Sequence, residues 1–203
     1  MPDELLTGWL SSSTPDLDCL LKVPFDYQPE AENQCFVYCV WMVMHYVKNK
    51  HPDEAVRKST RTFSPEEIMD YLTIVEGGWR PDQDELTLIS EKTRTIKFNL
   101  QYWQDGSPNQ LEDLLRKEIS SGMPVIPFID GLQLREGVRD DDGVHSVVAA
   151  GYNDKMVAIH DPWGYPEDVV KIERLEDAWD PMFNQLVTVS LSNRGSKLAG
   201  GNS

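Results

Sequence analysis

The stretch VPFDYQPEAENQCFVYCVWMVMHY, residues 23–46, decides the fold because it joins an extended segment to a long apolar one. Residues 36–47 are almost continuously apolar, which predicts a helix that is buried on most sides. Cys35 stands where this helix should begin. Unpaired backbone N–H groups and the helix dipole favour negative charge at a helix start, so they bias a thiol there toward the thiolate, the nucleophilic form of cysteine.

Gln28 precedes Cys35 by seven residues, in a loop constrained by Pro24 and Pro29. Its amide NH₂ group and the backbone N–H of Cys35 are suited to stabilise a developing oxyanion. The opposing interpretation is that Cys35 is inert, because free cysteines are among the most buried residues and usually pack as small hydrophobic side chains. This stretch alone favours the inert interpretation.

A second segment, GVHSVVAAGYNDKMVAIHDPWG at residues 143–164, changes that balance. Its pattern predicts a β-hairpin with strands at 145–152 and 156–160 around a turn at 153–155. Folding the strands about this turn sets His145 opposite a position between 161 and 163, so His145 and Asp161 face or nearly face each other. Such cross-strand pairs lie about 5 to 8 Å apart, within reach of a hydrogen bond. Neighbouring His160 should point to the other face.

The strings VPFDYQ, NQCFVYCVWMVMHYV, GVHSVVAAGY and HDPWG resemble the papain-like cysteine peptidases of the bacteriocin-processing type, the double-glycine leader peptidases and their stand-alone relatives. The similarity covers roughly residues 20–165. It implies a catalytic site made of Gln28, Cys35, His145 and Asp161. Trp163 resembles the aromatic residue that shields the His–Asp pair in that family, and we expect it to line the substrate site.

The order of predicted elements, helices first and strands later, is that of an α+β protein. With the resemblance, it predicts a papain-like cysteine peptidase fold, in which the central buried helix that carries the nucleophile packs on an antiparallel β-sheet. Further helices are predicted at 64–75, 84–91 and 107–120, strands at 95–103, 124–129, 169–172 and 186–191, and a helical turn at 175–179. Ser64 and Glu67 predict a capping box at the start of the first of these helices.

Length and composition fit one domain with a hydrophobic core, since the chain has 203 residues of which 40% are hydrophobic. We expect a lead-in segment at 1–20, the peptidase domain at 21–192 and a flexible tail at 193–203. The net charge of −15 argues against nucleic acid and anionic membrane as partners. The expected partner is a peptide or protein substrate, and the oligomeric state stays open.

The chain has three cysteines, a small and odd number that does not fit a disulfide scaffold, and this indicates a reducing compartment. The N-terminal residues are acidic and lack the apolar core of a signal peptide, and no run approaches the length of a membrane span. We therefore expect a cytoplasmic protein. No cofactor is expected.

Two alternatives to Cys35 as the nucleophile of a peptidase site involve neighbouring cysteines and histidines. Cys39 lies one helical turn after Cys35, but it should lie within the helix, where the backbone N–H groups are already paired. Cys35, Cys39, His145 and His160 together suggest a zinc site, but a Cys-x₃-Cys pair in one buried helix does not have the spacing of structural zinc sites. We therefore expect no metal.

The expected function is hydrolysis of peptide or isopeptide bonds through a Cys35–His145–Asp161 triad, with Gln28 as oxyanion donor. Two alternatives remain, a catalytically silent peptide-binding protein and an acyl transferase that uses the same thioester. A run of three aspartates, Asp140, Asp141 and Asp142, directly precedes the histidine segment. Such a run is ordinarily a solvated surface turn, but in this place we expect Asp141 and Asp142 to contact the substrate and to favour basic peptides.

Overall fold

The protein was analysed as a computed structural model, which describes residues 16–26, 28, 33–75, 78–79, 81–102, 110–137, 144–164, 169–179 and 185–192. Its helices are α1 (Cys35–Lys50), α2 (Glu54–Ser59), α3 (Pro65–Met69), α4 (Gln83–Thr93), α5 (Gln110–Ser120), α6 (Gly131–Glu136) and α7 (Ile172–Trp179). Its strands are β1 (Cys19–Leu20), β2 (Ile74–Val75), β3 (Gly78–Trp79), β4 (Ile96–Tyr102), β5 (Val125–Asp130), β6 (Val144–Ser146), β7 (Val148–Tyr152), β8 (Met156–His160), β9 (Val169–Lys171) and β10 (Gln185–Leu191).

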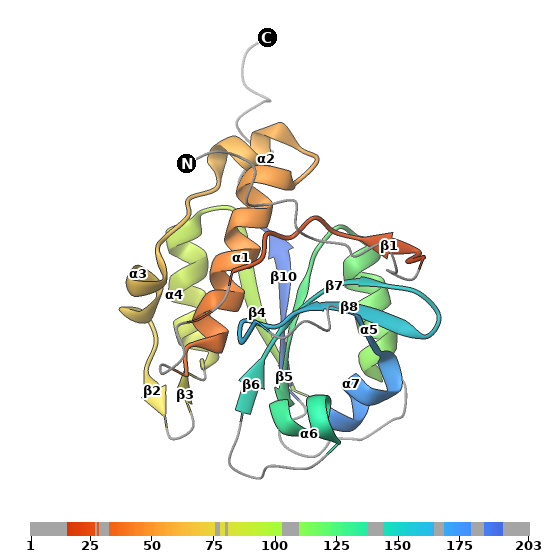
Figure 1. Ribbon diagram of the computed structural model, residues 1–203. Helices are drawn as coiled ribbons and strands as arrows, with labels where there is room; N and C mark the ends of the chain where they lie inside the picture. The colour runs from red at the N-terminus through yellow and green to blue at the C-terminus, as the bar shows by residue number, and fades with distance from the viewer. Residues whose placement is uncertain are drawn as a thin grey trace.

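The main sheet is antiparallel and separates two layers of helices (Figure 1). Within the described residues it has eight strands, in the order β4-β10-β5-β7-β8-β9, with β1 added to β7 and β6 to β5. Helices α1, α3 and α4 lie on one side of the sheet, and α5 and α7 lie on the other (Figure 1). This arrangement confirms the predicted α+β fold with a helix packed on an antiparallel sheet.

Each face of the sheet has its own hydrophobic core. On β5, Ile126 and Phe128 point into the core that contains α1, whereas Val125 and Ile129 point into the core that contains α5 and α7. Successive side chains of a strand point to opposite faces, so a strand covered on both sides has no polar alternation. This explains why all six residues of β5 are buried.

Helix α1 begins at Cys35, as predicted, and most of its side chains are buried. Phe36 stacks on Phe128 of β5, with the ring centroids 5.5 Å apart, and this contact fixes the start of the helix against the sheet. The helix ends at Lys50, where two lysines in the last turn complement the dipole and Pro52 follows.

The predicted hairpin is formed by β7 and β8, with Val148 opposite His160 and Tyr152 opposite Val157. In the turn, Asn153 Oδ1 accepts hydrogen bonds from the backbone N–H groups of Lys155 and Met156, at 2.9 and 2.8 Å. This local bonding by an asparagine is the turn chemistry on which the prediction rested.

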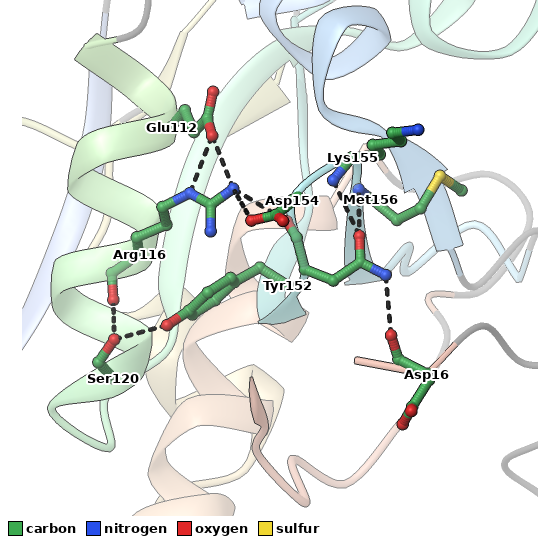
Figure 2. A network of polar contacts seen from close by, with 9 residues as sticks. Asp16, Glu112, Arg116, Ser120, Tyr152, Asp154, Lys155 and Met156 are labelled. Carbon is green, nitrogen blue, oxygen red and sulfur yellow. Dashed lines mark hydrogen bonds and ion pairs between the residues drawn. The ribbon is translucent and has the colours of Figure 1, made fainter. Parts of the chain in front are cut away.

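An arginine of α5 anchors this hairpin to the helix layer (Figure 2). Arg116 pairs with Glu112 at 2.7 Å and donates to the Asn153 carbonyl at 3.1 Å. Its guanidinium lies 5.0 Å from the ring centre of Tyr152, whose hydroxyl shares a 2.8 Å hydrogen bond with Ser120. The network fixes the turn end of the hairpin, opposite to the end that carries His160.

The predicted helix at 64–75 is wrong in its second half, because α3 ends at Met69. The capping box is present, since Ser64 Oγ accepts from the Glu67 N–H at 3.2 Å and Glu67 accepts from the Ser64 N–H at 2.8 Å. Beyond the helix, the Thr73 N–H donates to Glu85 of α4 at 2.6 Å, which removes it from any helical ladder. The β-branched Ile74 and Val75 then pair with Gly78–Trp79, where the prediction placed the helix end.

The other predicted helices and strands are confirmed to within a few residues, apart from the proposed cap of the helix at 107–120, which lies outside the described residues. Helices α2 and α6 were not predicted. Residues 1–15 of the expected lead-in and the tail at 193–203 also lie outside the described residues. In the part of the chain that the structure describes, no helix is long and apolar enough to cross a membrane.

Candidate active site

Cys35 is the first residue of α1 and only 6% of its surface is exposed. Burial alone would raise the pKa of its thiol, but the neighbouring His145 and Ser146 favour the thiolate and lower the pKa below the ordinary cysteine value. The helix start predicted for this thiol is therefore accompanied by a specific cationic partner. A lowered thiol pKa is typical of reactive cysteines, so Cys35 is the candidate nucleophile.

His145 is completely buried on β6, where its backbone pairs with Ile129 of β5. Its Nε2 lies 2.6 Å from Asp161 Oδ1. Nδ1 has no hydrogen-bond partner among the described residues, so it is the ring nitrogen that is available to the Cys35 sulfur. Burial would lower the pKa of His145, but the charge and hydrogen bond of Asp161 and the contact with Cys35 raise it to about 9. The raised pKa of His145 and the lowered pKa of Cys35 both favour a thiolate–imidazolium pair.

Asp161 follows β8 directly and uses both carboxylate oxygens. Oδ1 accepts from His145 and also from the backbone N–H of Trp163 at 2.9 Å, whereas Oδ2 pairs with Arg135 Nη2 at 3.3 Å. Burial acts to raise the pKa of Asp161, but His145, the Trp163 N–H and Arg135 hold it below its usual range. The side chain is therefore a fixed anion beside the imidazole.

Gln28 is brought to the same region by its backbone. Its N–H donates to the carbonyl of Pro162 at 2.7 Å, so the loop before α1 is tied to the residue that follows Asp161. The side chain is buried, and its Oε1 has no hydrogen-bond partner among the described residues. A buried amide oxygen without an internal hydrogen bond is unusual in a folded protein, and a catalytic role is one of the explanations for it.

Trp163 stacks on the His145 ring, with centroids 4.2 Å apart and planes inclined by 28°. It is 38% exposed, so it shields the histidine and presents a surface to solvent. The start of α6 comes equally close, because a Cβ added to Gly131 would lie 3.1 Å from the Cβ of His145. A larger residue at position 131 would therefore crowd the His145 side chain.

Sequence reasoning missed two residues of this site. Ser146 is buried beside His145 on β6 and contributes to the lowered pKa of Cys35, and its only signal in the sequence is its place next to His145. Nothing in the sequence around Arg135 indicates that it belongs to the site. It lies on α6, a helix that was not predicted, and it pairs with Asp161 across 26 positions of sequence.

Cys39 and His160, the alternative candidates for the nucleophile and for a metal site, are poorly suited to these roles. Burial, with the nearby charges of Cys35 and Asp161, raises the pKa of Cys39 well above the ordinary value, so this thiol is a poor nucleophile. Burial likewise lowers the pKa of His160 to about 3, and its ring lies 6.0 Å from that of Phe25. The structure does not bring His160 into the His145–Asp161 contact. Asp141 and Asp142 lie outside the described residues.

Comparison with known proteins identifies the family. Residues 20–187 match the Peptidase_C39-like family. A crystal structure described as that of a C39-like peptidase from Bacillus anthracis is similar, with a TM-score of 0.61 and 18% identity over 88% of this chain and 98% of that one. The peptidase domain of Streptococcus ComA, a bi-functional ABC transporter involved in quorum sensing, has a TM-score of 0.51 and 14% identity over 82% and 96% of the two chains. No curated protein matches. The chain belongs to the Peptidase_C39-like family and has the fold of a C39-like cysteine peptidase.

Proposed function

We propose that this protein is a cysteine peptidase that hydrolyses peptide or isopeptide bonds, with Cys35 as nucleophile, His145 as acid and base, and Asp161 as the group that orients His145. The observation that carries the proposal is the buried 2.6 Å contact between His145 and Asp161 beside a thiol whose pKa His145 lowers. Titratable groups whose pKa values are shifted together in this way are typical of catalytic sites.

The reaction follows from these charges. The Cys35 thiolate attacks the carbonyl carbon of the scissile bond, and the oxygen that becomes negative is stabilised by the Gln28 amide and the Cys35 N–H. His145 then gives its proton to the leaving amine, and the C–N bond breaks to leave a thioester. Water, deprotonated by His145, attacks the thioester, which releases the carboxylic acid and restores the thiolate–imidazolium pair.

A thiol enzyme of this kind needs a reducing compartment, so we further propose a cytoplasmic location. All three cysteines are free, which supports this proposal.

A thiol-directed activity probe with mass mapping of the labelled peptide tests the enzyme proposal. We expect labelling at Cys35 that is lost in His145→Ala, whereas absence of labelling in the wild type would favour a binding protein. Digestion of a peptide library, read by mass spectrometry, then identifies a substrate. Product analysis in the presence of added amines distinguishes a peptidase from an acyl transferase, because an acyl transferase would form amide products in place of the free acid.

Replacing Gln28 with alanine should lower kcat by about 10²-fold or more with little change in KM, because an oxyanion donor acts mainly in the transition state. The measurement is steady-state kinetics on the substrate found in the library. Gln34, the neighbour of Cys35 at the helix start, provides the control, since Gln34→Ala should have a smaller effect. A change confined to KM in Gln28→Ala would make Gln28 a substrate contact instead.

Changing Asp140, Asp141 and Asp142 together to asparagine should reduce a preference for basic over acidic peptides. Carboxylates on the rim of a cleft act at long range, so the preference should weaken above physiological salt, where the screening length falls below about 8 Å. The measurement is the ratio of kcat/KM for matched Lys-bearing and Glu-bearing peptides at low and high salt. An unchanged ratio at low salt would mean that this loop is only a solvated turn.

A further inference from the structure

Arg135 has no part in the reaction described above, although its side chain is only 11% exposed and it contacts two residues of the site. We propose that Arg135 is a positioning residue that fixes the turn at residues 161–164, and through this turn both the His145–Cys35 pair and the Gln28 loop. The proposal rests on the proposed function, because it concerns the alignment of the same groups.

Arg135 is itself held in place from two sides. Its backbone carbonyl accepts a hydrogen bond from Arg174 of α7, and the start of its helix is capped by Asp130, whose side chain accepts from the Gln133 N–H at 2.9 Å. At the same end of α6, Gly131 packs against the His145 side chain. The guanidinium therefore projects from a helix whose position relative to His145 is fixed.

The guanidinium makes two contacts with the turn. Nη2 lies 3.3 Å from Asp161 Oδ2, and the guanidinium carbon lies 4.0 Å from the ring centre of Trp163. Because Asp161 Oδ1 is taken by His145 and the Trp163 N–H, the carboxylate is held at both oxygens and cannot rotate away from the imidazole. A planar guanidinium suits both contacts, since it pairs with carboxylates and stacks on aromatic faces.

The turn at residues 161–164 also connects Arg135 to Gln28, the proposed oxyanion donor. The Gly164 N–H donates to the Asp161 carbonyl at 2.9 Å, which closes the turn, and the Pro162 carbonyl accepts from the Gln28 N–H at 2.7 Å. One segment of four residues thus holds the imidazole by a side chain and the Gln28 loop by its backbone. Displacing this segment would disturb the proton donor and the oxyanion donor together.

Charge gives Arg135 a second effect. With Cys35 and His145 as an ion pair, the buried groups form a chain of thiolate, imidazolium, carboxylate and guanidinium, which carries no net charge. Loss of Arg135 leaves a net negative charge in a buried site, which is costly and favours uptake of a proton. The groups that face the thiol and its partners within the described residues are His145 and Ser146 of β6, Cys39 of α1, Asp161 after β8 and Arg135 of α6. Protonation of the thiolate should therefore shift to higher pH.

The chain supplies a matched control in Arg116 of the α5 network (Figure 2). Like Arg135, Arg116 pairs with a carboxylate and lies near an aromatic ring, with Glu112 and Tyr152 in the places of Asp161 and Trp163. Its partners lie on α5 and at the turn end of the hairpin, and they include no residue of the site. Arg116→Gln therefore removes an equivalent structural interaction without touching the proposed catalytic groups.

The experiment measures the rate of Cys35 alkylation by iodoacetamide against pH, with each cysteine followed separately by mass spectrometry, in the wild type and in Arg135→Gln, Arg135→Lys and Arg116→Gln. The acid limb of the Cys35 profile is the pH range in which the alkylation rate falls as the thiolate takes up a proton, and we expect Arg135→Gln to move it to higher pH. The same variant should lower kcat/KM by about 10-fold to 100-fold, as misalignment of catalytic groups does. Arg116→Gln should leave the profile in place. Arg135→Lys keeps the charge and should keep the acid limb near its wild-type position, but it should lose several-fold in kcat because lysine cannot stack on Trp163 as a planar group.

Two outcomes would overturn the role of Arg135. One is an acid limb in Arg135→Gln that coincides with that of the wild type. The other, which serves if Arg135→Gln does not fold, is an Arg135→Lys variant with wild-type kcat. Failure of the proposed function has a different signature, because wild-type Cys35 would then react no faster than an ordinary thiol and would not depend on His145.

Discussion

Replacing Cys35 with alanine is expected to lower kcat by about 10⁴-fold or more while the protein stays folded. The thiolate forms the covalent intermediate, and no other thiol can replace it, because the pKa of Cys39 is raised well above the ordinary value by burial. The fold should survive because alanine removes one sulfur atom at a helix end, and His145 can release its proton so that no net charge is left buried. Steady-state kinetics and a thermal unfolding curve of the same preparation measure the two effects.

Cys39→Ala is the matched control for this variant. Cys39 is completely buried within α1, so its truncation should cost stability, on the order of 1 kcal/mol, and leave most of the activity. The two variants should therefore have different defects, with activity lost in Cys35→Ala and stability lowered in Cys39→Ala. Full activity in Cys35→Ala would contradict the assignment of the nucleophile.

Replacing His145 with alanine is expected to lower kcat by about 10³-fold or more, and Asp161→Asn should be less damaging. Histidine both holds the thiolate and protonates the leaving amine, whereas the amide oxygen of asparagine can still accept the Nε2 hydrogen bond and orient the ring. Kinetics of both variants at the pH optimum provide the test. Equal losses would mean that the charge of Asp161, and not its orientation of His145, governs the reaction.

The same variants should differ in pH dependence. Wild-type activity should fall on the alkaline side near pH 9, because the proton of His145 is needed for the leaving amine and its pKa is raised to about 9. The charge of Asp161 is a main cause of that rise, so Asp161→Asn should move the alkaline limb to lower pH. An alkaline limb that stays in place would show that another group controls it.

Besides Gln28, the site combines residues from four separate helices, strands and turns. Helix α1 brings Cys35, β6 brings His145, the turn after β8 brings Asp161 and Trp163, and α6 brings Arg135. The sheet makes this convergence possible, because β6 is paired with β5 and β8 with β7, and α6 begins where β5 ends. A buried ion pair needs such fixed surroundings, since it is stable only when further hydrogen bonds satisfy its members.

The sequence by itself determined the elements whose causes are local. The apolar run after Cys35 specifies a buried helix, and the polar turn at 153–155 specifies a hairpin, since each depends on side-chain period or on hydrogen bonds between near neighbours. The hairpin also predicted that His145 and Asp161 come together, and they do, although His145 lies on β6, beyond the paired residues of the hairpin. The prediction of one continuous strand at 145–152 was less accurate, as the strand is divided at Val147 and His145 pairs with β5.

Only the tertiary structure decided the rest. Residues 70–75 leave the helical path because Glu85 of a later helix accepts the Thr73 N–H, a contact that no local propensity encodes. The pairing of Arg135 with Asp161 and Trp163 likewise depends on where α6 packs. Local sequence patterns report period and turn chemistry, whereas contacts between distant segments arise from the packing of the whole sheet and its helices. For that reason the triad candidates could be found in the sequence, and the arginine beside them could not.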